Sequence, residues 1–257
     1  MQDAYRVAWL LEKKQLSYAL LGAHSSQILQ AGIYRQEEGI GRQEFEEIYA
    51  SLPVNEFSQA WVGVDSGRVL LLPSVLAHTT ADGKLYETIY NLYPGEVLKQ
   101  HALPDDRHCL FPVKTGSLQL LEQKMPATDW LDASACLTAL YTRSDINSFA
   151  CTFFVQVKEE GILLTSFSSS TLQWQRYLAE GHPRDVLYFL SNLLQEQQLE
   201  ASGVQIRIHG DEGGQALVMR ELQPYFPEIV SWSVTEWPGL PSTLSTDERN
   251  WLTPLIA

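Results

Sequence analysis

The chain has 257 residues, of which 45% are hydrophobic and 19% are charged, a balance typical of a folded globular protein rather than a disordered one. Its formal net charge of −13 argues against non-specific nucleic-acid binding, because an acidic surface repels phosphate and no cluster of Lys or Arg offsets that repulsion. The three widely spaced cysteines form neither a CxxC motif nor a disulfide framework, so reduced thiols in a cytoplasmic protein are expected.

Neither a membrane span nor a signal peptide is predicted. The apolar runs are far shorter than the about 20 residues that cross a bilayer. The start of the chain, from Met1 to Lys14, has no basic region before its apolar residues and no small-residue cleavage site after them. These features again indicate a soluble protein of the cytoplasm.

The first third of the chain predicts an antiparallel meander followed by a helix and a strand. Segments rich in β-forming residues are separated there by short polar turns. They are Tyr5–Leu11, Leu16–Ala23 and Ile28–Tyr34. From Arg42 to Leu52 apolar residues recur with the period of a helix, which predicts an amphipathic helix, and Ala60–Val64 is the next predicted strand.

The middle of the chain mixes short strands and helices. The predicted strands are Val69–Leu72, Glu96–Leu103 and Cys109–Val113. Helices are predicted around Tyr86, around Leu121 and over Trp130–Tyr141. Because Pro126 ends the second of these helices, we expect one half of the molecule to comprise residues 1–126 and the other residues 127–257.

The second half repeats the order of the first. Its predicted meander consists of Cys151–Val157, Ile162–Phe167 and Leu172–Leu178. The clearest helix of the chain runs from Pro183 to Leu199, since proline suits the first helical position and the apolar residues form a wide face. A tight turn at Gly210–Gly214 follows the next strand. The remaining elements are predicted at Val204–Ile208, Ala216–Tyr225 and Ile229–Val234.

A repeated unit of a strand meander, a helix and a further strand is the framework of the actin-like, ribonuclease H-like α/β fold. The sequence therefore predicts a duplication: two such halves, each with a mixed sheet and flanking helices.

Three segments of the second half carry a family resemblance. They are Ile162–Phe167, Leu172–Leu178 and the helix start that contains Asp185 and Tyr188. In these segments the chain resembles a family of uncharacterised bacterial proteins known as a domain of unknown function, and the resemblance covers most of the chain. It implies a distant relation to the actin-like ATPase superfamily of sugar kinases, chaperone ATPase domains and pilus or division scaffolds, and it implies no particular reaction. Gln173-Trp174-Gln175 departs from the Asn-x-Phe element usual in the family.

Nucleotide binding by such a fold depends on particular turns. In actin-like proteins the first hairpin of each half is similar to Asp-x-Gly-(Thr/Ser), where the acid positions Mg²⁺ and the glycine lets backbone N–H groups reach phosphate. Here the turn Glu12–Gln15 has no glycine, and the turn Lys158–Gly161 places two acids where phosphate needs donors. Both departures argue against ATP hydrolysis and favour a non-catalytic binding or scaffold module without a cofactor.

Two other turns support an alternative function. Asp65 and Gly67 follow an apolar strand as a phosphate turn would, although such residues beside a serine are also ordinary turn chemistry. Gly210, Gly213 and Gly214 lie between a strand and a helix, where the superfamily has adenosine-contacting glycines, but the two acids among them would repel an anion. Under this alternative the protein is a divergent kinase or ATPase that binds ATP and Mg²⁺ in the cleft between its halves.

Another protein is the expected partner. Trp237 precedes a proline-rich turn, and an exposed aromatic residue there is typical of a partner contact, although single exposed apolar residues are also common. The residues His101, Asp105, Asp106 and His108 fit no standard zinc spacing, so no metal site is predicted.

Overall fold

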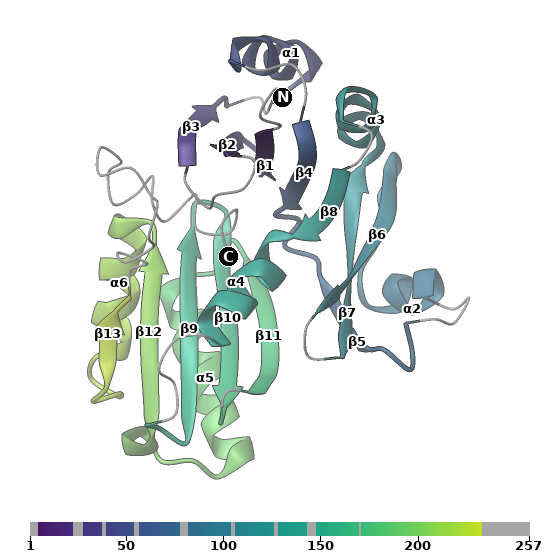
Figure 1. Ribbon diagram of the computed structural model, residues 1–257. Coiled ribbons are helices and arrows are strands. Elements are labelled where there is room, and N and C mark those ends of the chain that lie inside the picture. The colour runs from purple at the N-terminus through teal and green to yellow at the C-terminus, as the bar shows by residue number, and fades with distance from the viewer. Residues whose placement is uncertain are drawn as a thin grey trace. The chain divides into compact units, whose positions relative to one another are not determined.

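The computed structural model describes residues 5–22, 28–37, 40–53, 57–77, 82–103, 106–125, 128–142, 148–169 and 171–232. Their contacts divide them into two compact units, one ending at Leu137 and the other beginning at Thr138. The boundary expected between residues 126 and 127 stays a prediction. Each unit has a mixed sheet of its own (Figure 1).

The sheet of the first unit has the strand order β3-β2-β1-β4-β8 (Figure 1). The predicted meander is confirmed as β1 (Tyr5–Leu11), β2 (Gln15–Leu21) and β3 (Ile28–Arg35). Helix α1 (Arg42–Ser51) leads to β4 (Phe57–Val64), which pairs in parallel with β1. The core on one face of this sheet contains Trp9, Phe45 and Val62, with the rings of Trp9 and Phe45 5.2 Å apart between centroids.

One predicted helix is wrong in its first three residues and confirmed in the rest. Trp130–Tyr141 was expected to be helical, but β8 (Thr128–Asp132) is a strand parallel to β4, and helix α4 covers only Ala133–Thr142. Asp132 separates the two elements, because its Oδ1 accepts hydrogen bonds from the backbone N–H groups of Ser134 at 2.9 Å and Ala135 at 3.1 Å. A side-chain acceptor in this position starts a helix and leaves the residues before it free to pair as a strand.

An insertion with its own small sheet lies between β4 and β8. Its strands are β5 (Leu70–Pro73), β6 (Glu96–Leu103) and β7 (Arg107–Lys114), in the order β5-β7-β6. Helix α2 (Asp82–Ile89) lies between β5 and β6, and helix α3 (Thr115–Lys124) leads to β8. Leu110, on one face of β7, lies in a small core with Tyr86, whereas Phe111, on the other face, lies in the main core of the unit.

The second unit has the strand order β11-β10-β9-β12-β13. Its predicted meander is confirmed as β9 (Cys151–Lys158), β10 (Gly161–Ser168) and β11 (Thr171–Ala179). The later elements are α5 (Pro183–Gln197), β12 (Val204–Gly210), α6 (Glu212–Leu222) and β13 (Ile229–Ser231), with a short 3-10 turn at Ala201–Gly203. Strands β12 and β13 extend the sheet in parallel with β9, as β4 and β8 do with β1 in the first unit.

Helix α5 shows how local sequence sets this architecture. Pro183 occupies its first turn, and the backbone N–H of His182 donates to the Asp185 carboxylate at 2.8 Å, which closes a capping box. Val186 and Leu190 recur on one side of the helix and are fully buried against the sheet. Burying side chains of this size stabilises the fold by about 1.5–3 kcal/mol each.

Helix α6 begins earlier than the sequence predicts. Gly210–Gly214 was expected to be a turn before a helix at Ala216, but the helix starts at Glu212. Gly213 and Gly214 therefore belong to its first turn, because Asp211 caps the helix directly after β12.

Candidate functional site

The site residues expected from the sequence lie at the carboxyl ends of inner strands in the two sheets. Asp65 follows β4, and its backbone N–H donates to the carbonyl of Leu11 at the end of β1 at 2.9 Å. Asp211 follows β12, and its backbone N–H donates to the carbonyl of Val157 near the end of β9, also at 2.9 Å. The two aspartates thus occupy equivalent positions in the two units. Open α/β sheets bind ligands at this kind of edge.

The first hairpin of each unit lies beside its aspartate. In the first unit the backbone N–H of Glu12 donates to the carbonyl of Gln15 at 2.9 Å and closes a turn around two lysines. In the second unit Lys158 pairs with Gly161 and closes a turn around two glutamates. The same backbone element therefore presents basic side chains in one unit and acidic side chains in the other.

The carboxylate of Asp211 occupies the N-terminus of α6. Its Oδ2 accepts a hydrogen bond from the backbone N–H of Gly214 at 2.7 Å. The side-chain amide of Gln215 donates to the carbonyl of Gly210 at 2.7 Å and ties the helix back to β12. Helix N-termini attract anions because their N–H groups lack partners within the helix. Here a side chain of the chain itself already provides the anionic group.

Two of the three glycines at this turn are required by packing against β9. Gly210 has a φ of +110°, and a Cβ atom there would lie 1.9 Å from the carbonyl oxygen of Val157. A Cβ atom on Gly214 would lie 2.4 Å from Cγ1 of Val157. A Cβ atom on Gly213 would meet only the Asp211 carboxylate, at 3.4 Å. Close approach to β9, by the end of β12 at Gly210 and by the first turn of α6 at Gly214, thus accounts for both glycines without a ligand.

The loop after Asp65 has a different architecture, because no helix follows. Gly67 has a φ of +63°, a left-handed conformation that glycine adopts without strain. The Ser66 hydroxyl accepts a hydrogen bond from the backbone N–H of Arg68 at 3.1 Å. The loop then enters the insertion, so Asp65 and Gly67 lie where the insertion leaves the main sheet.

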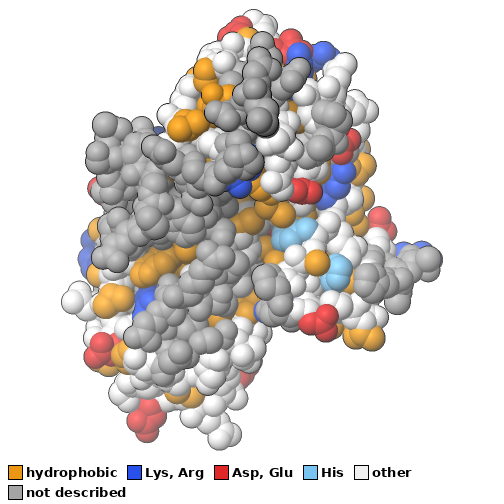
Figure 2. Space-filling view, in the orientation of Figure 1, with side chains coloured by type: hydrophobic (Ala, Val, Ile, Leu, Met, Phe, Trp, Pro, Cys, Tyr) orange, Lys and Arg blue, Asp and Glu red, His pale blue; other side chains and the backbone are white. Residues whose placement is uncertain are grey.

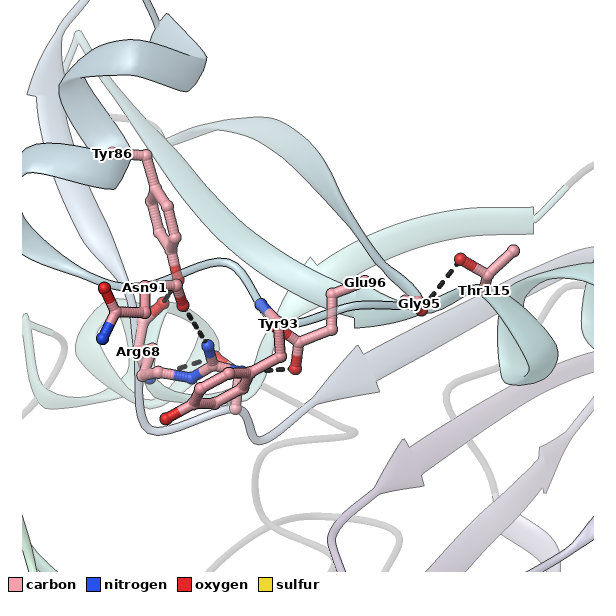
Figure 3. Close-up of polar contacts among 8 residues, drawn as sticks. Arg68, Tyr86, Asn91, Tyr93, Gly95, Glu96 and Thr115 are labelled. Carbon is pink, nitrogen blue, oxygen red and sulfur yellow. Dashed lines mark hydrogen bonds and ion pairs between the residues drawn. The ribbon is translucent and has the colours of Figure 1, made fainter.

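Arg68 holds the base of the insertion together (Figure 3). Its guanidinium pairs with the Glu96 carboxylate, donates to the carbonyl of Asn91 at 2.6 Å and lies 4.5 Å from the centroid of the Tyr93 ring. Burial alone would raise the pKa of Glu96, but the hydrogen bonds from Arg68 and from the backbone N–H of Tyr93 outweigh it, so the pKa lies below its ordinary value. This partly buried, ionised pair is a fixed structural contact.

The segment that leads from the inserted sheet back to β8 contributes to the same network. The hydroxyl and the backbone N–H of Thr115 both donate to the carbonyl of Gly95, at 2.8 and 2.7 Å (Figure 3). The Tyr86 hydroxyl donates to the carbonyl of Arg68 at 2.8 Å. We call these contacts among Arg68, Tyr86, Glu96 and Thr115 the neck of the insertion. Sequence reasoning missed it, because an Arg–Glu pair separated by 28 positions leaves no local pattern.

A second buried polar contact lies in the second unit. The Tyr141 hydroxyl and His209 Nε2 lie 2.5 Å apart and share a hydrogen bond, and the Tyr141 ring stacks on Phe154 at 3.9 Å between centroids. Complete burial, with the nearby charge of Lys158, lowers the pKa of His209 to about 3. A neutral histidine therefore anchors the end of α4 to the sheet.

Histidine side chains also reach the surface over the inserted sheet (Figure 2). His101 Nδ1 accepts from the backbone N–H of Asp132 at 3.4 Å. Burial, with a smaller effect of His108, lowers the pKa of His101 to about 4. In the part of the chain that the structure describes, no group of three or more His, Cys, Asp or Glu side chains is arranged to hold a metal ion.

Trp237 lies outside the described residues. The cysteines Cys109, Cys136 and Cys151 are free thiols, and burial raises the pKa of each above its ordinary value. None of the helices within the described ranges has both the length and the apolar composition needed to cross a membrane.

Residues 2–229 match the model of a family described as "Protein of unknown function (DUF3822)", so the chain belongs to that family. No curated protein matches the sequence.

Solved structures show the fold. A Bacteroides thetaiotaomicron VPI-5482 protein, described as having an actin-like ATPase fold and unknown function, is 12% identical with a TM-score of 0.77, over 90% of this chain and 91% of that one. A chain of the PilM-PilN type IV pilus biogenesis complex is 11% identical with a TM-score of 0.59, over 98% and 97%. The ethanolamine utilization protein EutJ of Carboxydothermus hydrogenoformans is 7% identical with a TM-score of 0.50, over 100% and 89%. The chain thus has a duplicated, actin-like α/β fold, as the sequence predicted.

Proposed function

We propose that this member of the DUF3822 family is a non-catalytic binding or scaffold module whose actin-like fold has lost its nucleotide turns. The observation that carries the proposal is the filled turn between β12 and α6. Val157 packs against Gly210 and Gly214, and the Asp211 carboxylate takes the N–H group of Gly214. A nucleotide phosphate at this place would have to displace an internal carboxylate of the same charge.

The hairpin turns support the same proposal. Phosphate binding by a tight turn needs several backbone N–H groups that converge on the ligand, and glycine makes that approach possible. The turn after β1 has no glycine, and the turn after β9 carries two glutamates at its tip. In this proposal no nucleotide or metal cofactor is needed, and the fold serves as a rigid framework.

The proposed partner is another protein. One of the structurally similar chains comes from a complex, PilM-PilN, in which the similar fold is found together with a second protein. Acidic side chains are scattered over the face shown in Figure 2, and the net charge is −13, so a nucleic-acid partner is disfavoured. The three free cysteines suit the proposed cytoplasmic location, where thiols stay reduced.

A divergent nucleotide-binding enzyme is the second candidate. The equivalent positions of Asp65 and Asp211 at ligand-binding edges of the two sheets favour it. In that case Asp65 and Gly67 in one unit, and Gly210, Gly213 and Gly214 in the other, would contribute to a site for ATP and Mg²⁺.

Thermal unfolding with and without millimolar Mg-ATP, Mg-ADP and Mg-GTP separates the two candidates. A ligand at about 100 times its dissociation constant stabilises a protein by about 2.7 kcal/mol, which raises the Tm of a chain of this size by several degrees. We expect no shift. A shift that persists in Leu217→Ala, a surface control on α6, and disappears in Asp65→Asn would contradict the proposal and show nucleotide binding that depends on Asp65, as the second candidate requires.

A further inference from the structure

The sheet of the first unit is covered on one face by α1 and α3, whose side chains form the main core with Trp9. Its other face is buried as well. Since side chains alternate along each strand, small and apolar residues from the middle of β1 and β2 lie there together. Those that are no more than 1% exposed are Ala8, Leu10, Ser17 and Ala19. We call the face that these four residues form the reverse face of the first sheet.

The second sheet has an equivalent reverse face. Leu11 and Val157 hold equivalent positions, because the carbonyl of each accepts the backbone N–H of the aspartate that follows the neighbouring strand. Ala8 precedes Leu11 by three residues, and Phe154 precedes Val157 by three residues, so Ala8 and Phe154 are equivalent. Phe154 therefore lies on the reverse face of the second sheet.

Helix α4 covers the reverse face of the second sheet. The Tyr141 ring stacks on Phe154 at 3.9 Å between centroids, and the side-chain amide of Gln175 donates to the Thr138 hydroxyl at 3.1 Å. This helix follows β8 without a linker, and β8 is the last strand of the first sheet in chain order. In a duplicated fold, the segment that follows the last strand of the second sheet is then expected to cover the reverse face of the first.

Strand β13 is the counterpart of β8, since each is the last strand of its sheet and pairs in parallel at the same edge. Residues 233–257 come after β13 and Trp232, and they lie outside the described residues. This stretch has 25 residues, whereas each of the other stretches outside the described residues has at most five. Helix α4 has ten residues, so a counterpart of α4 fits into the terminal stretch and into none of the others.

The sequence of this stretch predicts a helix. Ser245 and Glu248 have the spacing of a capping box, which predicts a start at Thr246, and Pro254 predicts an end at Thr253. Large apolar residues gather at the end of this predicted helix and directly after it. They are Trp251, Leu252, Leu255 and Ile256.

The sizes of the side chains on the two reverse faces favour the same assignment. Ala8 pairs with Ala19 in the register of the first sheet, where the second sheet pairs Phe154 with Thr165. Phe154 contributes a large ring to its contact with α4, whereas the two alanines leave that volume to whatever packs on them. Protein interiors are packed without large voids, so the cover of the first sheet needs large apolar side chains.

We propose that residues 246–256 are the counterpart of α4 and pack their large apolar side chains on the reverse face of the first sheet. The end of the chain then completes the unit that the start of the chain begins. This inference does not depend on the proposed binding function, because it concerns a contact of the chain with itself. It assigns the reverse face to the chain, so a partner binds elsewhere.

Photo-cross-linking of the full chain tests the proposal. The photoreactive residue p-benzoylphenylalanine replaces Leu252, chains linked to each other are separated by size, and mass spectrometry of the digest locates the adduct within single chains. We expect an adduct with β1, β2 or β4. The same residue in place of Leu217, which is 45% exposed on α6, is the control and should give no adduct with those strands.

A double-mutant cycle gives a second readout. Ala19→Leu enlarges a side chain under the proposed contact, and we expect it to lower the urea midpoint of unfolding. In a chain that also carries Leu252→Ala and Leu255→Ala the larger side chain has room, so the loss should shrink by about half or more. Ala216→Leu is the control, since Ala216 is exposed on α6, and its effect should be the same in both backgrounds.

Three outcomes overturn the proposal. An adduct confined to the second unit, or one formed only between two chains, would place the segment elsewhere. The absence of any adduct would mean that residue 252 does not pack against protein. Equal losses from Ala19→Leu in both backgrounds would mean that the segment does not touch the reverse face. These readouts involve neither nucleotide nor partner, so their failure is distinct from a failure of the proposed function.

Discussion

The chain leaves β4 and β12 at equivalent backbone positions, but different structures follow the two strands. In both units an aspartate N–H donates to the end of the first strand at 2.9 Å. After Asp211 a helix begins at once, and the carboxylate caps it. After Asp65 the chain enters an inserted sheet whose base is closed by Arg68 and Glu96. An equivalent backbone position therefore does not preserve the role of its side chain, which depends on the element that follows.

The largest loss of stability is expected from a substitution in the turn between β12 and α6. Gly210→Ala places a Cβ atom 1.9 Å from the carbonyl oxygen of Val157 at a φ of +110°, so the backbone of two adjacent strands must shift. We expect a loss of about 4 kcal/mol in the free energy of unfolding, measured by urea denaturation. Gly213→Ala is the control, because its Cβ atom has room, and alanine in a helix should leave stability unchanged or raise it by up to about 1 kcal/mol. Equal losses in both variants would contradict the packing explanation.

The next effect concerns the neck of the first unit. Arg68→Met leaves the Glu96 carboxylate partly buried without its cationic partner, and the side chain of Glu96 is only 10% exposed. Removing one member of such a pair should lower stability by about 2–3 kcal/mol and raise the pKa of Glu96. Urea denaturation measures the loss of stability, and hydrogen exchange along β6 shows whether the loss is local to the neck. Arg42→Met, which removes the exposed pair Arg42–Glu46, should lower stability by about 0.3 kcal/mol, and a similar loss in both variants would show that the neck is not a buried clamp.

Acid should destabilise the chain through its buried histidines. The folded pKa of His209, about 3, lies below the ordinary value of 6.5, so the unfolded chain binds the proton first. This contribution to stability is complete above pH 6.5 and is lost as the pH falls from there toward 3. At pH 5 the loss from His209 is about 2 kcal/mol. His101 acts in the same direction in the first unit.

Denaturation of the unchanged chain and of His209→Gln at several pH values isolates this effect. The variant should be less stable near pH 7, because Tyr141 loses its partner, and its stability should fall less steeply toward pH 5. Parallel pH profiles for the two proteins would mean that His209 takes up a proton as readily in the folded state as in the unfolded one.

The smallest expected effect is on the cap of α6. Asp211→Ala removes the acceptor for the N–H of Gly214 and should lower stability by about 1 kcal/mol, as measured by denaturation. Asp211→Asn keeps an oxygen acceptor and should recover most of that loss. If Asp211→Ala instead created binding of millimolar Mg-ATP in the thermal assay, the turn would be a masked nucleotide site.

Local patterns in the sequence were sufficient for most elements of the fold. The meanders follow from runs of β-forming residues between short polar turns, α1 from helical periodicity, and α5 from periodicity and a proline at its start, and all of these signals act over a few neighbouring residues. Strand β8 was not predicted because the apolar residues of α4 follow it directly and no local pattern shows that Asp132 caps the helix between them. The start of α6 was predicted too late because Asp211 caps this helix, while the glycines after Asp211 are typical of a turn.

The candidate site was harder to predict, because its contacts join distant parts of the chain. Gly210 and Gly214 were identified as unusual, but their reason, Val157, lies on another strand and becomes visible only with the register of β9 and β12. The equivalence of Asp65 and Asp211 also depends on register, that of β1 with β4 in the first unit and that of β9 with β12 in the second. The pairing of Arg68 with Glu96 required the geometry of the inserted sheet.

The insertion also affects the order in which the sheets can assemble. Strand β4 ends at Val64 and β8 begins at Thr128, so residues 65–127, which are 63 residues, separate them, whereas β12 and β13 are separated by residues 211–228, which are 18. The longer connection raises the entropic cost of bringing the two strands together by about 1 kcal/mol. During synthesis β4 can pair with β1, but its other neighbour, β8, is absent until the inserted sheet has emerged from the ribosome. Closure of the neck before β8 is made would hold Arg68 near Thr115 and so shorten the effective loop that closes when β8 pairs with β4.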